Sequence, residues 1–165
     1  MSFILPDSRL AHLMRHFGAN DLAGSYFLPE VFATPTELVD FINAHPHTHS
    51  IDQGNGRMAF LYETSDKTIV GTCGLARRED VDAGSIIREQ REGYTLEIGY
   101  AESLPFTHEF CVIADRCEDD FHIITAFPGG YARPFAQKSQ PREEYELNKK
   151  FWEEHVLLKQ KNTMQ

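Results

Sequence analysis

The sequence predicts an α+β fold in which two helices come first, an antiparallel sheet follows, and a further helix closes the chain. Apolar residues recur at helical spacing near the start of the chain and again after residue 141. Between them the spacing shifts towards alternation, in segments rich in β-branched and aromatic residues that short polar turns separate. We therefore expect a mostly antiparallel meander of about five strands between helices.

Two helices are predicted before residue 45. The first follows Pro6-Asp7-Ser8 and can stop at Gly18. The second begins at the capping box of residues 34–37, and it ends near Ala44 because Pro46 disfavours helical geometry at the residue before it. On the first helix four apolar side chains share one face: Leu10, Leu13, Met14 and Phe17.

The predicted sheet follows a turn at residues 50–56. We place its strands from Met58 onward and over residues 68–75, 94–101, 109–114 and 121–127. The charged stretch 76–92 is expected to be a solvated excursion with room for a short helix.

A closing helix is predicted to start at Pro141, with an apolar stripe that extends to Val156 and Leu158. No repeat or linker divides the chain, so we expect a single domain over residues 1–165.

Composition limits the classes of function. With 16 basic and 25 acidic residues the net charge is −9, which opposes diffuse attraction to a phosphate backbone, so contact with RNA requires a local basic patch. The three cysteines form no CxxC pair and no apolar leader precedes Asp7, so we expect a reduced cytoplasmic setting. No apolar run approaches the roughly 20 residues of a membrane span, and we expect no membrane partner.

Histidines suggest two further sites, each with a simpler explanation. His45, His47 and His49 alternate and could converge on a transition metal, although Pro46 also favours an exposed loop. His12 and His16 are four residues apart, as in HExxH metalloproteases, but no glutamate stands between them, which favours a solvated pair. We expect no cofactor and no metal.

The most distinctive segment is FHIITAFPGG at residues 121–130. We predict that it forms a hairpin with the strand at residues 107–114. It resembles the closing strand, roughly V-I-T-A-Y-P, of the barnase, EndoU, colicin and RelE-like group of ribonuclease toxins, particularly the RNase A-like toxins of contact-dependent inhibition systems. The resemblance implies that Thr125 is an active-site residue and that His16 is the histidine supplied by an early helix. It also places Phe127 where the family commonly has tyrosine, so this chain lacks that hydroxyl.

Metal-free RNA cleavage needs a base, an acid and donors for the phosphate charge. His16, His108, Thr125 and Arg133 could fill these roles, and each also has a structural interpretation as a rim, strand or ion-pairing residue.

The leading hypothesis is thus a metal-independent ribonuclease-like domain, active or degenerate, that binds RNA. The alternative is a non-enzymatic interaction protein of the immunity or phage type whose acidic surface covers a basic partner. A small-molecule binding or hydrolase domain that uses the histidine-rich loop ranks third. Clustering of Arg15, Arg116 and Arg133 around Thr125 would favour the enzyme, whereas a continuous acidic face would favour the binding protein.

Overall fold

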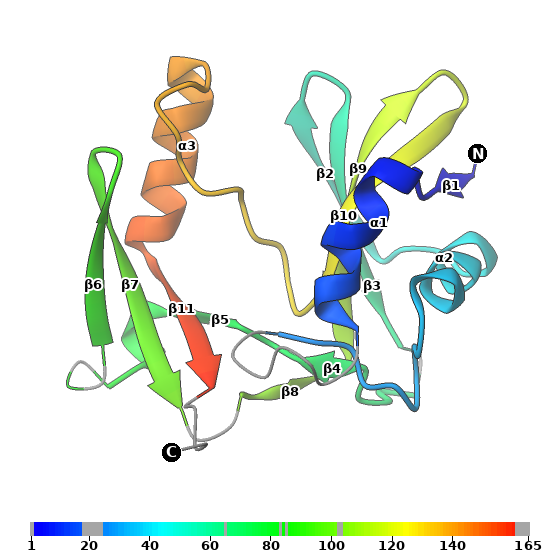
Figure 1. Cartoon of the computed structure of the whole chain (residues 1–165), viewed down its shortest axis with the longest axis horizontal. Coiled ribbons are helices and arrows are strands. Elements are labelled where there is room, and N and C mark those ends of the chain that lie inside the picture. The colour runs from blue at the N-terminus through cyan, green and yellow to red at the C-terminus, as the bar shows by residue number, and fades with distance from the viewer. Residues whose placement is uncertain are drawn as a thin grey trace. The chain divides into compact units, whose positions relative to one another are not determined.

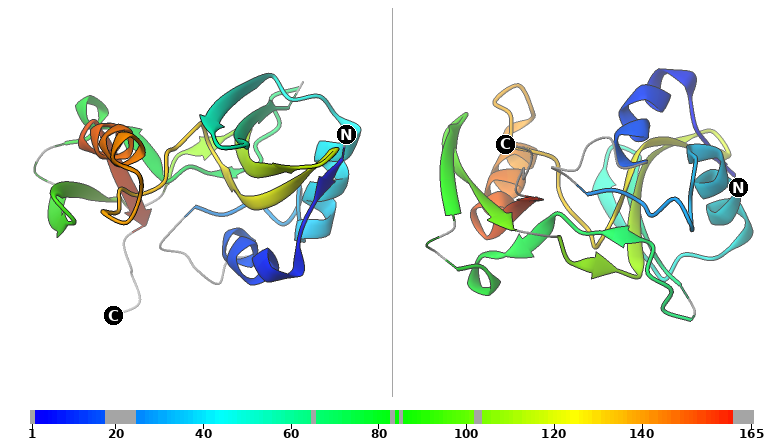
Figure 2. Two further views of the ribbon diagram at one scale, coloured as in Figure 1. Left: turned by 90° about the horizontal axis from the view of Figure 1, so that it is seen from above. Right: turned by 60° about the horizontal axis from the view of Figure 1, so that its bottom comes forward.

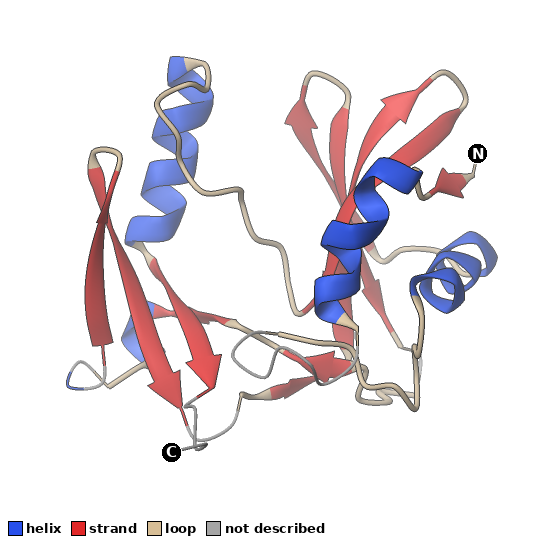
Figure 3. Cartoon of the chain, in the orientation of Figure 1, coloured by secondary structure: helices blue, strands red, loops and turns tan. Residues whose placement is uncertain are grey.

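The structure is a computed structural model that describes residues 2–17, 25–64, 66–82, 84, 86–101 and 104–160. It is α+β, as predicted, with helices beside mostly antiparallel sheets (Figure 1; Figure 3). The chain divides into two compact units: unit 1 is Met1–Cys73 with Pro105–Tyr131, and unit 2 is Gly74–Leu104 with Ala132–Gln165. The single domain stays a prediction, because the compactness of each unit does not decide whether they unfold together.

Unit 1 contains the two early helices, α1 (Asp7–Leu13), which continues as the 3-10 turn η1 (Met14–His16), and α2 (Pro35–Ala44). The Thr34 hydroxyl accepts a hydrogen bond from the Glu37 amide at 3.3 Å, so the predicted cap of α2 is confirmed. The expected stop at Gly18 lies outside the described residues.

No helix in the described ranges is long and apolar enough to cross a bilayer.

The apolar face predicted for the first helix is correct only in part. Leu13 and Phe17 are buried, but Leu10 and Met14 remain 41% and 48% exposed. Only the side of this short helix that carries Leu13 meets the core, and Leu10 and Met14 lie on its exposed side.

The main sheet of unit 1 has the strand order β1-β10-β9-β3-β2. Its members are β1 (Phe3–Ile4), β2 (His49–Gly54), β3 (Arg57–Glu63), β9 (Glu109–Cys117) and β10 (Asp120–Pro128). The β1–β10 pairing is parallel and the other three are antiparallel. A separate two-stranded sheet joins β4 (Gly71–Thr72) to β8 (Phe106–Thr107).

The turn predicted at residues 50–56 is shorter than expected. Most of that segment forms β2, and the turn is confined to Gly54-Asn55-Gly56, where all three φ angles are positive. Two glycines and an asparagine are the residues that adopt this left-handed backbone at low cost.

The two faces of the main sheet of unit 1 differ. One face packs against α1 and α2, which lie on the same side of the sheet (Figure 2), and its core is rich in phenylalanine, with Phe27, Phe32 and Phe110 in edge-on contact. The other face, here called the outer face, has a smaller buried centre of Ala59, Cys111 and Ile113. Because neighbouring residues of a strand point to opposite faces, the outer face carries the side chains that alternate with the helix-side core.

Unit 2 is a four-stranded sheet with one helix. Its strand order is β5-β11-β7-β6, formed by β5 (Leu75–Arg77), β6 (Ile86–Arg91), β7 (Tyr94–Ala101) and β11 (His155–Gln160). The helix α3 (Arg142–Glu153) packs Trp152 against Tyr94 and Leu96, and a 3-10 turn, η2 (Arg78–Asp80), follows β5.

The closing helix is shorter than predicted. It ends at Glu153, and Val156 and Leu158 belong to β11 rather than to a helical stripe. These two side chains join one core cluster while Leu157 between them joins another, which is the period of two of a strand. The strand is parallel to β7 and antiparallel to β5.

The segment 76–92 also differs from the expectation, since it contains β6, paired with β7 in a hairpin. In the described part of the chain there are eleven strands in three sheets, more than the expected five in one meander.

Candidate functional site

The hairpin of β9 and β10 places the predicted strand residue Thr125 on the outer face of unit 1. Ile123 pairs with Ala114 and Thr125 with Ile113, so Ile124 is an extra residue in β10. This bulge reverses the alternation, and Thr125 and Phe127 therefore share the face of Ile113 and Cys111. Thr125 is partly exposed, and no described group forms a hydrogen bond with its hydroxyl.

His16, at the end of η1, is next to this part of β10. Its ring centroid lies 6.3 Å from that of Phe127. Its Nδ1 is 3.0 Å from the Ser25 carbonyl oxygen, which can only accept a hydrogen bond, so Nδ1 is the donor in this contact. Two of the predicted site residues, His16 and Thr125, are thus both neighbours of Phe127.

His108 lies elsewhere on the hairpin. Its Nε2 is 3.0 Å from Glu63 Oε1, on the neighbouring strand β3. His108 precedes Ile113, the partner of Thr125, by five residues, which corresponds to about 16 Å along an extended chain. The structure does not bring His108 to Thr125.

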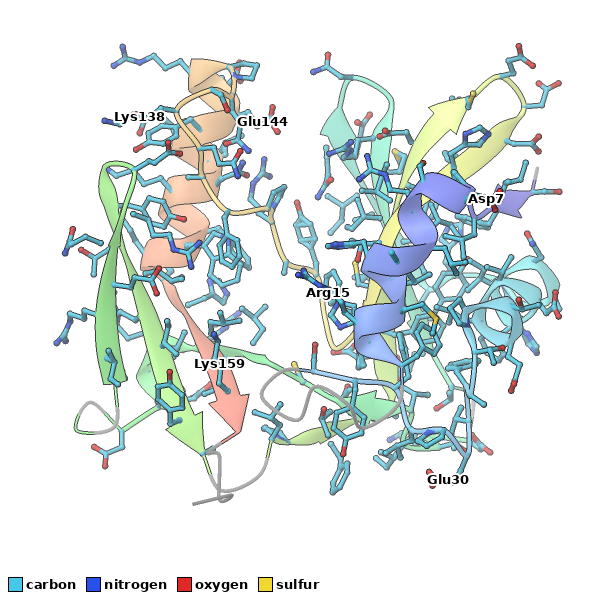
Figure 4. The ribbon with its side chains drawn as sticks, viewed as in Figure 1. Asp7, Arg15, Glu30, Lys138, Glu144 and Lys159 are labelled. Atoms are coloured by element: carbon cyan, nitrogen blue, oxygen red, sulfur yellow. The ribbon has the colours of Figure 1, made fainter. Side chains whose placement is uncertain are left out.

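The expected arginines are also dispersed. Arg133 belongs to unit 2, where its Nε donates to Asn148 Oδ1 at 2.7 Å, and its carbonyl accepts a hydrogen bond from the Trp152 indole. Arg116 lies over the Phe121 ring, on the helix side of the sheet rather than the outer face. Of the three arginines expected at Thr125, Arg15 is the one next to His16 in the chain, in η1 (Figure 4).

Two other cations, Arg57 and His122, lie on the outer face of the sheet beside Asp115. Arg57 of β3 donates to both carboxylate oxygens of Asp115, at 2.8 and 3.1 Å, and His122 of β10 is the partner of Asp115 on its other side. The hydrogen bond from Arg57 holds the pKa of Asp115 below its usual range, and the charges of Arg57, Arg9 and His122 lower it further.

The charges of α1 complete this arrangement. Burial lowers the pKa of His12, and the nearby guanidinium groups of Arg15 and Arg9 lower it further. Arg9 also contributes to lowering the pKa of Asp115, so the charge of α1 reaches the Arg57–Asp115 pair.

Sequence reasoning missed Arg57 and His122. A signal for His122 was present, because the apolar residues Phe121 and Ile123 on either side of it predict that His122 points away from the core. The register that sets Arg57 and His122 on either side of Asp115 has no such local signal.

The histidine-rich loop does not converge on a point. His45 stacks on Phe41 with ring centroids 4.1 Å apart, His47 packs edge-on against Phe60, and His49 Nδ1 lies 3.3 Å from the Thr48 hydroxyl. Within the described ranges no group of three or more histidine, cysteine, aspartate or glutamate side chains is placed to hold a metal ion.

Comparison with known proteins adds no assignment. No family model matches the chain, no curated protein matches its sequence, and no solved structure matches its fold.

Proposed function

We propose that the chain is a metal-independent ribonuclease-like domain whose site lies on unit 1, where η1 meets β10. The observation that carries this proposal is the position of His16 beside Phe127, two residues along the strand from Thr125. The neighbouring cations Arg9 and Arg15, which both lower the pKa of His12, support it, because an acidic chain needs a local positive region to hold a phosphate.

The proposed residues have distinct roles. His122 lies about 7 Å from Thr125, two strand positions along β10 and on the same face. In the other direction along β10, His16 of η1 lies beside Phe127. His16 accepts the proton of the 2′-hydroxyl through Nε2, the 2′-oxygen bonds to phosphorus, and the bond to the 5′-oxygen breaks. His122 supplies the proton of that departing oxygen, while the Thr125 hydroxyl, Arg9 and Arg15 donate to the phosphate oxygens; Arg57 stays paired with Asp115.

The other two predicted residues are not needed in this arrangement. His108 is engaged with Glu63, and Arg133 with Asn148 of unit 2. The three cysteines, all among the described residues, form no disulfide, which fits our proposal that the protein works in the reduced cytoplasm.

A second function is favoured by a different surface. The turn between β9 and β10 carries Glu118, Asp119 and Asp120 in a chain of net charge −9. A non-enzymatic interaction protein would present such a turn to a basic partner.

The test is cleavage of total RNA by the purified protein in excess chelator. We expect His16→Gln to reduce the rate about 100-fold or more, the typical contribution of a proton-transferring side chain. Thr125→Val keeps the side-chain shape without the hydroxyl, and we expect about a tenfold loss, the value of one charge-assisted hydrogen bond.

His108→Gln is the matched control, because this histidine lies on the same hairpin and far from Thr125 along the strand. It should cleave at the wild-type rate. Equal losses in all three variants would contradict the proposed location of the site, and an inactive wild-type protein would favour the interaction protein.

A further inference from the structure

Glu97 is a buried carboxylate in the middle of unit 2. It lies in β7 between Leu96 and Ile98, which face α3, so its side chain points to the opposite face of the sheet, where it is only 3% exposed. Burying an ion costs several kcal/mol unless oppositely charged groups compensate it. This carboxylate therefore requires cationic partners.

Two arginines supply them. Arg78 of η2 forms an ion pair with Glu97 Oε1, and Arg88, directly across from Glu97 on β6, has an amino nitrogen 3.7 Å from Oε2. Both arginine side chains remain more than half exposed, at 53% and 62%.

Each guanidinium has more donors than Glu97 can use. A guanidinium carries five N–H groups, and for Arg78 and Arg88 Glu97 is the acceptor that the described residues provide. An arginine that keeps N–H donors beyond those its partner carboxylate accepts can bind a second oxyanion with them.

The arginines line a cavity of about 280 Å³, whose other walls are Val81, Ile86, Thr95 and Glu97. Two positive charges there face one negative charge. A neighbouring cavity of about 480 Å³ also includes Arg78, but it is lined by Glu79, Glu153 and Glu154, which disfavour an anion.

We propose that Arg78 and Arg88, held in place by Glu97, form a binding site for the carboxylate or phosphate group of a small ligand. The oxyanion lies between the two guanidinium groups, and the apolar part of the ligand contacts Val81 and Ile86. The cavity is at or below the lower end of the roughly 300–1,000 Å³ common for ligand pockets, so the ligand is small. All of these residues belong to unit 2, so this site is independent of the ribonuclease proposal.

The experiment is an NMR titration of the full chain with inorganic phosphate and, separately, with acetate, at constant ionic strength. We expect saturable shifts of the Nε–H signals of Arg78 and Arg88. The anion that binds more tightly identifies the ligand group as phosphate or carboxylate.

Arg88→Gln removes one guanidinium from an exposed position and should weaken binding about tenfold, which corresponds to the loss of one charge-assisted interaction. Arg91→Gln is the control, because Arg91 lies on the same strand but pairs with Glu89 and covers Phe135 on the α3 face. The proposal is wrong if neither anion causes saturable shifts, or if the control variant weakens binding as much as Arg88→Gln.

Discussion

Asp115 in unit 1 and Glu97 in unit 2 are both carboxylates held by arginines on the sheet face opposite the α-helices. They differ in burial, since the side chain of Asp115 is 39% exposed and that of Glu97 is 3% exposed. Water can solvate Asp115 without its partner, whereas Glu97 depends on arginines for its charge to be tolerated. An arginine–carboxylate pair is therefore solvated in unit 1, whereas in unit 2 the arginines compensate a buried charge.

The largest expected effect is a difference in stability between two matched substitutions. Arg78→Met should lower the free energy of unfolding by about 3 kcal/mol, because it removes the closest partner of a buried carboxylate and leaves only Arg88 nearby. Arg57→Met should cost only about 0.5 kcal/mol, because both members of its pair are partly exposed.

Urea unfolding of the two variants and the wild type measures these free energies. Equal losses in both variants would show that burial does not separate the two carboxylates. A larger loss in Arg57→Met would reverse the comparison.

A smaller effect is expected on the loss of stability at low pH. The pKa of Asp115 is lowered in the folded state, mainly by the hydrogen bond from Arg57, so its contribution to stability is present above the unfolded value of about 3.9. The contribution is lost as the pH falls through the lower folded pKa. Wild-type stability should therefore fall more steeply below about pH 4 than that of Asp115→Asn, by less than about 1 kcal/mol because the side chain is partly exposed.

Chemical denaturation at a series of pH values from 5 to below 3 provides the measurement. Asp119→Asn, in the exposed turn of the same hairpin, controls for the change in net charge. If Asp115→Asn and the wild type have the same pH profile, the ion pair of Asp115 does not contribute to the pH dependence of stability.

The smallest expected effect is a change in the pKa of His12 when the neighbouring Arg15 is replaced. Burial is the main cause of the low pKa of His12, and Arg15 is the next. Arg15→Gln should therefore raise the pKa of His12 only part of the way to about 6.5. An NMR titration of the His12 ring measures this pKa, with Arg116→Gln as the control, because Arg116 is not among the charges that lower the pKa of His12.

The elements predicted correctly are those with local signals. The cap at Thr34, the break before Pro46 and the polar turn between β9 and β10 each depend on a few neighbouring residues. By contrast, β11 was assigned to a helix, because Trp152, Val156 and Leu158 fit a helical stripe as well as they fit separate elements. Its partner β7 lies more than fifty residues earlier in the chain, and no local sequence pattern predicts that pairing.

The candidate site was predictable to a similar degree. The resemblance of the 121–130 segment directed attention to Thr125 and His16, which the structure sets around Phe127. The grouping of His108 with Thr125 depended on hairpin register, which the sequence does not determine. The bulge at Ile124, which decides the face that Thr125 occupies, also has no sequence signal such as a glycine.

The position of β11 between β5 and β7 has a consequence for how the protein is made. A ribosome synthesises residues 155–160 after every other strand of unit 2, yet this strand bridges the two halves of that sheet. Until it emerges, the nascent chain presents β7 with one edge unpaired, and such an edge is a template for pairing with other chains. Unit 2 therefore cannot close its own sheet until residues 155–160 have been synthesised.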